Sequence, residues 1–300
     1  MDQIIREARK ETKPMMVGYK NMERIENTEH VFADDIVITA SSERELQHNL
    51  NIWNMAIRKN GLKINSKKTK VMKITREKTK ELKIKLEGKY IEQVNSYKYL
   101  GVTFEEDGKM DCELNKRIGQ ANRTYFALNR GFIEKQEISK NTKMRIYKAV
   151  YRPILTYGCE SWVLNKKEKV RIGAMEMKYL RKVKGVNRLQ RHRNEDIRRE
   201  LEIQPITEYI EKRQLEWWGH LMRLPNNTPT RKIWEARSYG KRKRGRPEET
   251  WDDTIKKIME KKKVTIKKGE RNGKGQENME KIHHQLTPKE KQPSYIHLLG

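Results

Sequence analysis

The sequence predicts an α+β segment, then an all-helical segment, then a disordered basic tail. In the first third, short apolar runs alternate with turn residues, which is typical of strands and hairpins. After Gly108, apolar residues recur every three or four positions, the period of an α-helix. From Glu260 onward Lys, Gly, Gln and Asn dominate, and this composition buries too little apolar area to offset chain entropy. We therefore expect three parts, at residues 1–108, 109–259 and 260–300.

The first elements of the chain surround a pair of acidic residues. Apolar residues at helical spacing in residues 4–8 predict a short amphipathic helix that Pro14 ends. The apolar run from Val31 to Ala40 is interrupted by Asp34 and Asp35. This pattern predicts two short strands that fold back on each other around an acidic turn.

A helix follows the acidic turn. Ser42 and Glu45 have the spacing of a capping box, and an apolar stripe begins directly after them. The stripe consists of Leu46, Leu50, Trp53 and Ile57. The pair Asn60 and Gly61 predicts the end of this helix. Further strands are expected at residues 62–64 and 71–74, and a hairpin around Gly88 at residues 82–94.

The second part reads as a bundle of helices. Apolar stripes at helical spacing lie in residues 118–128, 147–155, 172–183, 210–222 and 251–258. Pro153 predicts a kink in the second of these helices, because proline removes a backbone hydrogen bond. Thr250 is expected to cap the last helix, and glycines stand where helix C-caps are expected. These glycines are Gly131, Gly158 and Gly185.

Charge and cysteine content narrow the classes of partner. The 300 residues carry 68 Lys and Arg against 41 Asp and Glu, a formal charge of +27. Such a field attracts polyanions, so nucleic acid is the expected partner. A membrane is not expected, because no run approaches the about 18 apolar residues of a spanning helix, and the N-terminus lacks a signal peptide's apolar core. Cys112 and Cys159 alone cannot form a zinc knuckle, so zinc is not expected either. We expect an intracellular protein of the nucleus, of unknown oligomeric state.

The acidic pair is the first candidate for chemistry. Two adjacent carboxylates at the tip of an apolar hairpin repel each other and are desolvated, unless a cation neutralises them. Mg²⁺ fits, because it prefers hard oxygen ligands and can bridge a carboxylate and a substrate phosphate. Asp34 and Asp35 are therefore candidate metal ligands and catalytic residues. The alternative is an ordinary exposed turn of two aspartates.

Two downstream motifs supply further candidates. In GLKINSKKTKVMKI, Lys68 could neutralise or protonate a departing pyrophosphate, although it could equally be a solvated surface lysine. In SYKYLGVTF, Tyr97 and Tyr99 alternate on one strand face, and Gly101 allows another backbone to approach closely. Such a strand could hold the end of a nucleic acid, or it could simply pack within a sheet.

The order FADD, then GLKIN with KTK, then YLG resembles the palm of reverse transcriptases from non-LTR, LINE-type retrotransposons. The resemblance implies Mg²⁺ at Asp34 and Asp35, a nucleotide-side role for Lys68, and a primer grip at residues 99–101, that is Tyr99, Leu100 and Gly101. It continues through YRPILTYGCESW, LEWWGHLMRL and RGRPEETWDD, which look like the thumb and C-terminal helices, and it covers about residues 1 to 259. The implied partners are RNA and DNA as template and primer. The implied domains are a partial palm, a helical thumb with C-terminal region, and a tail.

The sequence also departs from the family. The family palm uses a further aspartate on an upstream strand and a Gln-Gly segment at the nucleotide pocket, and neither occurs here. Met1 therefore resembles a start inside the palm, with fingers and endonuclease absent, so the chain is expected to be a C-terminal fragment. Mg²⁺ demands near-ideal octahedral geometry, so a site short of one carboxylate would hold it poorly.

Two other clusters are candidates for contacts with nucleic acid. The run RSYGKRKRGRP, residues 237 to 247, suits phosphate contacts, or else acts as a nuclear-localisation-like or solubilising loop. Its candidate nucleic-acid-binding residues are Lys241, Arg242, Lys243, Arg244 and Arg246. Trp217 and Trp218 could stack on bases, but tryptophans on an amphipathic helix are more often core residues. The histidines have no metal-ligand spacing with cysteine and stay unassigned.

The expected ancestral function is RNA-directed DNA polymerisation, and the chain alone is expected to be inactive for want of the upstream aspartate. One alternative is a non-catalytic nucleic-acid-binding protein derived from a decayed retroelement. Another is a gene fragment without a selected role. The sequence leaves these alternatives open.

Overall fold

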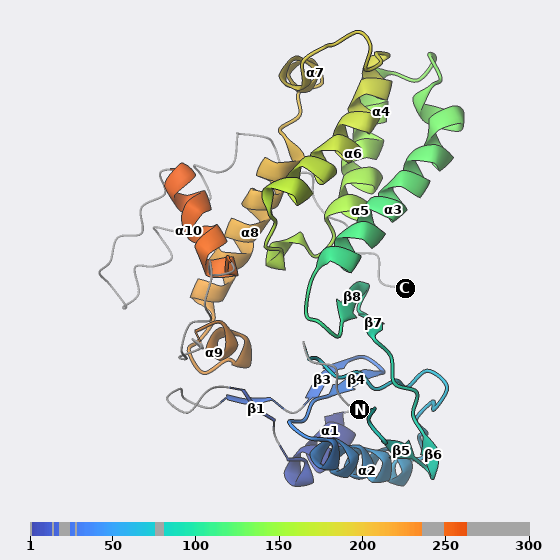
Figure 1. The fold of residues 1–300 in the computed structure, drawn as a ribbon, viewed down its shortest axis with the longest axis vertical. Coiled ribbons are helices and arrows are strands. Elements are labelled where there is room, and N and C mark those ends of the chain that lie inside the picture. The colour runs from blue at the N-terminus through green and yellow to red at the C-terminus, as the bar shows by residue number, and fades with distance from the viewer. Residues whose placement is uncertain are drawn as a thin grey trace. The chain divides into compact units, whose positions relative to one another are not determined.

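Figure 1 shows a computed structural model of the chain, which describes residues 2–13, 15–17, 25–27, 29–75, 81–235 and 249–262. The chain divides into two compact units, Met1–Gly119 with Pro225–Gly245, and Gln120–Leu224 with Arg246–Gly300. The basic segment 237–247 lies outside the described residues, and so does all but the start of the expected tail 260–300. At that start the structure differs from the expectation, because the last helix continues through Lys261.

The strands of the N-terminal unit form separate antiparallel hairpins in the part of the chain that is described, rather than the single sheet that a palm would have. The acidic turn joins one pair and the YLG turn joins another, so both motifs lie on hairpins. The pairs are β1 (Met15–Val17) with β2 (Ile25–Asn27), β3 (Glu29–Phe32) with β4 (Asp35–Ile38), β5 (Lys85–Leu86) with β6 (Lys89–Tyr90), and β7 (Ser96–Tyr99) with β8 (Val102–Glu105).

The acidic hairpin packs on two helices, α1 (Asp2–Glu11) and α2 (Glu43–Lys59). The two helices share one apolar core, made of Ile4, Ala8, Ile52, Trp53, Ala56 and Ile57. Apolar residues of the hairpin are half-buried against this core, namely Val31, Ile36 and Ile38. The predicted hairpin at residues 31–40 and its packing on the predicted helix are therefore confirmed, and the same core fixes the base of the acidic turn.

The α2 helix begins and ends where the sequence predicts. The backbone N–H of Glu45 donates to Ser42 Oγ at 3.3 Å, which is the expected N-cap bond. The reciprocal bond differs from the predicted capping box, because the Glu45 carboxylate accepts from the N–H of Ser41 at 3.2 Å instead of Ser42. Asn60 is the C-cap, and Gly61 follows with φ 74°.

Two of the predicted strands do not form. Residues 62–65 have no strand, and at 71–74 only Val71 makes an isolated bridge, to Gln93. The cause is local: the Asn65 side chain accepts the backbone N–H groups of Lys67 and Lys68 at 3.1 and 3.2 Å, which turns the chain where a strand would continue. The predicted hairpin around Gly88 is present as β5 and β6.

The remaining described elements are helical. In the helical unit π-helical or 3-10 turns interrupt the α-helices, and α9 (Pro229–Glu235) belongs to the N-terminal unit. The α3 helix crosses the division between the units. In chain order these elements are α3 (Asp111–Leu128), the π segment η1 (Asn129–Ile133), α4 (Lys140–Ile146), the π segment η2 (Tyr147–Tyr151), α5 (Arg152–Thr156), the 3-10 turn η3 (Cys159–Ser161), α6 (Lys166–Lys184), α7 (Asn194–Glu200), α8 (Ile206–Arg223) and α10 (Trp251–Lys261).

The predicted helix ends are mostly confirmed. Gly185 caps α6 in the left-handed conformation, and Gly158 adopts φ 75° just after α5. The prediction for Gly131 is wrong, because this glycine lies inside the π segment η1. The kink expected at Pro153 takes the form of the π segment η2 directly before the proline. Thr250 caps α10 with a reciprocal bond from Asp253, as predicted.

The core of the helical unit holds a buried polar network. Tyr147, Tyr151 and Tyr179 pack with ring centroids 4.7 to 5.9 Å apart. Next to them the Glu176 carboxylate is fully buried, accepts from the Tyr147 hydroxyl at 3.2 Å, and pairs with Arg198 at 2.7 Å. Burial raises the pKa of Glu176 above its ordinary value, although Arg198 acts in the opposite direction. The network therefore ties α4–η2, α6 and α7 together. Among the described helices, none has the length and apolar character needed to cross a membrane.

Candidate functional site

The two aspartates lie at the tip of the β3–β4 hairpin. Phe32 pairs with Asp35, so Ala33 and Asp34 form a two-residue loop. Ala33 takes φ 54°, a left-handed conformation that alanine rarely adopts. Both carboxylates are solvent-exposed. The expectation that they are desolvated is therefore wrong, because the apolar residues of the hairpin bury its base and leave its tip in solvent.

The YLG motif forms a second hairpin of the same kind. Leu100 and Gly101 are the two loop residues, with φ 47° and 83°, the signs of a type I′ turn. Tyr97 pairs with Phe104 across the hairpin, and Tyr99 lies on the same face two residues along. Tyr97 and Phe104 are 38% and 47% exposed. The hairpin thus presents an aromatic face to solvent, and the alternative of ordinary sheet packing does not describe that face.

A buried ion pair on α3 holds the second hairpin in place. Arg117 pairs with Glu113 one helical turn away, and these side chains are only 9% and 2% exposed. The Glu113 carboxylate also accepts the backbone N–H of Thr103 at 2.7 Å, and Arg117 donates to the carbonyl oxygen of Gly101. We call Glu113 and Arg117 the brace. It fixes the backbone on the C-terminal side of the YLG turn.

The two hairpins come close to each other within the N-terminal unit. Burial raises the pKa of the Tyr99 phenol above its ordinary value, and the negative charge of Asp35 raises it further. A charge acts on a phenol in this way only at short range, because solvent screens more distant charges. Asp35 of the acidic hairpin and Tyr99 of the YLG hairpin therefore share one site.

Lys68 is not joined to that pair by any contact. Its side chain is exposed on the turn that Asn65 organises, and no hydrogen bond or ion pair links it to Asp34 or Asp35 within the described residues. Its nucleotide-side role stays a prediction. The basic candidates Lys241, Arg242, Lys243, Arg244 and Arg246 lie outside the described residues.

The donors fit Mg²⁺ in kind but not in number. Asp34 and Asp35 offer the hard oxygen ligands that this ion prefers. Within the described residues, however, no group of three His, Cys, Asp or Glu side chains could hold a metal ion. The described site therefore does not form a complete metal centre, and we derive no chemical step through one.

Sequence reasoning missed three residues of this region. Phe104 was within the quoted motif, and continuing the two-residue alternation from Tyr97 across a two-residue turn would have placed it beside that tyrosine. Glu113 and Arg117 had a weaker signal, the four-residue spacing of opposite charges at the start of a helix. That spacing usually marks an exposed pair, and only the fold shows that this one is buried.

The segment that holds both hairpins matches a known protein family. Residues 1–104 match the family described as reverse transcriptase (RNA-dependent DNA polymerase). The match runs from α1 to Phe104 on β8, so it contains the acidic turn and the YLG turn. No solved structure matches the chain.

Three curated relatives come from mobile elements. An uncharacterized transposon-derived protein of Caenorhabditis elegans is 27% identical over 235 residues, which cover 75% of this chain and 83% of that protein. In Drosophila melanogaster, the RNA-directed DNA polymerase from mobile element jockey is 24% identical over 204 residues, and the protein named as an RNA-directed DNA polymerase of transposon X-element is 26% identical over 206 residues. Each alignment covers 65% of this chain but only 22% of the Drosophila protein. These matches support a relation to the reverse transcriptases of non-LTR retrotransposons.

Proposed function

We propose that this chain is a reverse-transcriptase-derived protein that binds a primer–template of RNA and DNA and does not extend the primer by itself. The observation that supports binding is the meeting of the two hairpins, in which the charge of Asp35 reaches the phenol of Tyr99. Both hairpins lie in the segment that matches reverse transcriptases. The formal charge of +27 supplies the attraction for a polyanion.

In this proposal the YLG hairpin contacts the primer end. Tyr97 and Phe104 offer exposed ring faces on which a sugar or base can pack, and the brace holds their strands at a fixed angle. Asp34 and Asp35 are the candidate Mg²⁺ ligands, and Lys68 is the candidate contact for the nucleotide. Two-metal nucleotidyl transfer needs ions held about 4 Å apart by carboxylates from more than one strand. The described residues supply two adjacent carboxylates, so we expect no polymerisation by this chain alone.

Binding and catalysis are tested separately on the full chain. Fluorescence anisotropy with a labelled DNA primer on an RNA template measures affinity, and Mg²⁺-dependent incorporation of a labelled nucleotide measures catalysis. Tyr97→Ala with Phe104→Ala should weaken duplex binding about tenfold, since stacking contributes about 1–3 kcal/mol for each base. Tyr90→Ala is the matched control, because Tyr90 is an aromatic residue of the same unit, 64% exposed, on a different hairpin.

The aspartates give an independent reading of the site. Replacing Asp34 and Asp35 by Asn should strengthen metal-free binding, because two negative charges beside the phosphates are removed. Glu11→Gln, an exposed acid on α1, should change it little. Unchanged duplex affinity in both sets of variants would overturn the binding proposal. Incorporation by the unaltered chain that the Asn variant abolishes would overturn the expected inactivity and imply that another carboxylate completes the site.

A further inference from the structure

One face of α8 carries a row of flat side chains. Tyr209, Arg213, Trp217 and His220 follow at intervals of four, four and three residues, so they lie along one stripe of the helix. We call these four residues the α8 strip. The neighbouring stripe is buried and anchors the helix in its unit, through Ile210, Gln214, Trp218 and Leu221. Trp217 keeps 37% of its surface exposed, whereas Trp218 is in the core, 9% exposed.

The members of the α8 strip are held in place by neighbours. The Trp217 and His220 rings stack with centroids 5.2 Å apart and an angle of 27° between their planes. The Arg213 guanidinium donates to Glu160 at 3.0 Å and to Glu216 at 3.2 Å. Burial lowers the pKa of Arg213, but the two carboxylates outweigh that effect and raise it, so the guanidinium stays charged. These flat groups are therefore ordered before any ligand binds.

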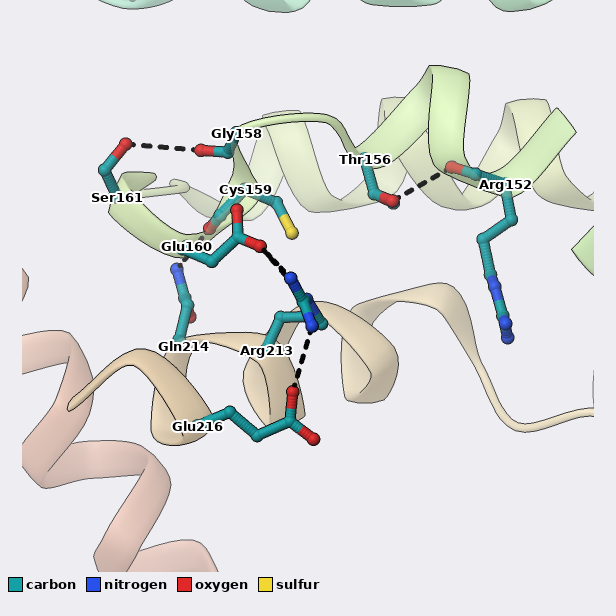
Figure 2. A network of polar contacts seen from close by, with 9 residues as sticks. All are labelled: Arg152, Thr156, Gly158, Cys159, Glu160, Ser161, Arg213, Gln214 and Glu216. Atoms are coloured by element: carbon teal, nitrogen blue, oxygen red, sulfur yellow. Dashed lines mark hydrogen bonds and ion pairs between the residues drawn. The ribbon is translucent and has the colours of Figure 1, made fainter. Parts of the chain in front are cut away.

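An open hollow of about 510 Å³ lies against the α8 strip. Arg213, Trp217 and His220 line one side, and the loop of Gly158, Glu160 and Ser161 lines the other. Figure 2 shows how Arg213 bridges from α8 to Glu160 on that loop. Its volume lies within the range of about 300–1,000 Å³ that small-ligand sites occupy.

The wall opposite the α8 strip is fixed from two directions. The buried Gln214 side chain donates to the carbonyl oxygens of Cys159 and Trp162, at 3.2 and 2.7 Å. The indole N–H of Trp251 on α10 donates to the carbonyl oxygen of Glu160 at 2.8 Å. The hollow thus joins the YGCESW and LEWWGH motifs, more than 50 residues apart in the chain, for which the polymerase site leaves no role.

An uncompensated cation stands at one end of the α8 strip. The guanidinium carbon of Arg152 lies 4.1 Å from the centre of the Tyr209 ring. Its Nε is buried without a hydrogen-bond partner in the described part of the chain, and no described carboxylate pairs with Arg152. In Figure 2 the Arg152 side chain extends toward α8 while Arg213 alone takes up the carboxylates. Arg152 therefore leaves a positive charge beside the ring of Tyr209, where an anion would be stabilised.

We propose that the α8 strip and Arg152 bind single-stranded nucleic acid, with an unpaired base stacked on Trp217 in the hollow and a phosphate near Arg152. Flat aromatic and guanidinium faces are what unstacked bases pack against, and the anionic backbone complements the free guanidinium. The Glu160 and Glu216 carboxylates can accept from amino groups of the base. A cationic peptide fits less well, because Arg213 already pairs with both carboxylates and Arg152 would repel it. This site lies in the helical unit and does not depend on the proposed primer-binding site.

The test uses the full chain and labelled 12-residue single strands of mixed sequence, one RNA and one DNA, with affinity measured against salt concentration. Trp217→Ala should weaken binding about tenfold without changing the slope of log affinity against log salt, because stacking releases no counterions. Arg152→Met should lower that slope by about 0.7, the value for one phosphate contact on a single strand. Phe126→Ala, at an aromatic residue 61% exposed on α3, is the matched control and should change neither quantity. The two strands show whether RNA, DNA or both are bound.

Two further variants keep the outcome decisive. Trp217→Phe preserves an aromatic face and should retain affinity within about threefold, so that a loss in Trp217→Ala cannot be attributed to misfolding. Tyr97→Ala with Phe104→Ala should leave single-strand binding intact even where duplex binding falls, which separates this site from the polymerase proposal. Affinity of Trp217→Ala equal to that of Phe126→Ala, or a Trp217→Phe protein as weak as Trp217→Ala, would overturn the proposal. Either result would favour a protein partner at the hollow.

Discussion

The brace predicts a large local effect from one side chain. Replacing Arg117 by Met preserves most of its length but leaves the Glu113 carboxylate buried, charged and without its guanidinium partner. Because the Arg117 and Glu113 side chains are 9% and 2% exposed, solvent cannot substitute for the missing guanidinium. Removing one member of a buried ion pair typically costs about 3–5 kcal/mol. The destabilisation should appear mainly at the YLG hairpin, where Gly101 and Thr103 bond to the brace.

Native-state hydrogen exchange measures this effect where it arises. The amide of Thr103 donates to Glu113 at 2.7 Å, so its exchange reports opening of the hairpin against α3. We expect Arg117→Met to speed exchange of this amide by about a hundredfold or more, the rate equivalent of about 3 kcal/mol. Exchange in the core of the helical unit, for example at Tyr179, should change much less.

A double-variant cycle separates the pair from simple loss of packing. Glu113→Gln keeps an oxygen that can accept the Thr103 amide and removes the charge, so Glu113→Gln with Arg117→Met should cost less than the sum of the two single changes. The coupling expected for residues in contact is about 1–3 kcal/mol. If Arg117→Met speeds Thr103 exchange less than fivefold, or if the two changes are additive, the reasoning from burial is refuted.

Three further outcomes are expected. Burial raises the pKa of Cys159 to about 12, so this thiol should resist alkylation in the folded protein while the half-buried Cys112 reacts first; equal rates in a timed mass-spectrometric assay would contradict this. The pKa of Glu176 is raised above 4.5 in the folded state, so its contribution favours folding at acid pH and is lost as pH rises through the folded value; Glu176→Gln should flatten this part of a plot of urea midpoint against pH, and an unflattened plot would count against it. Replacing the four basic residues 241–244 by Ala should lower the salt slope of duplex binding by about 0.9 for each phosphate that the segment no longer neutralises, and an unchanged slope would place that segment away from the interface.

The sequence was a good guide wherever a local pattern was enough. The period of apolar residues and the caps located α2, α6, α8 and α10, and the run around Asp34 located the acidic hairpin. It failed where a side chain competed with the backbone. Asn65 turned the chain where a strand was expected, and the π segment at Gly131 absorbed an expected helix end.

The site was predicted less fully than the fold. The order of motifs pointed to Asp35 and Tyr99 separately, and only the packing of two hairpins brings them together. Exposure was not predictable either, because an apolar run says which residues are buried but not that the hairpin tip projects beyond them. The difference between Trp217 and Trp218 has the same origin: one residue along a helix is a rotation of about 100°, which is enough to leave the core.

The π segment Tyr147–Tyr151 has a consequence for the spacing of insertions and deletions in this chain. A π turn holds one more residue than an α turn, so it changes the phase of everything that follows it. Deleting a single residue here, such as Ala149, would leave a continuous α-helix of good geometry and would still rotate Arg152 by about 100° away from Tyr209. A related chain without the extra residue would therefore keep the helix and lose the cation at the end of the α8 strip.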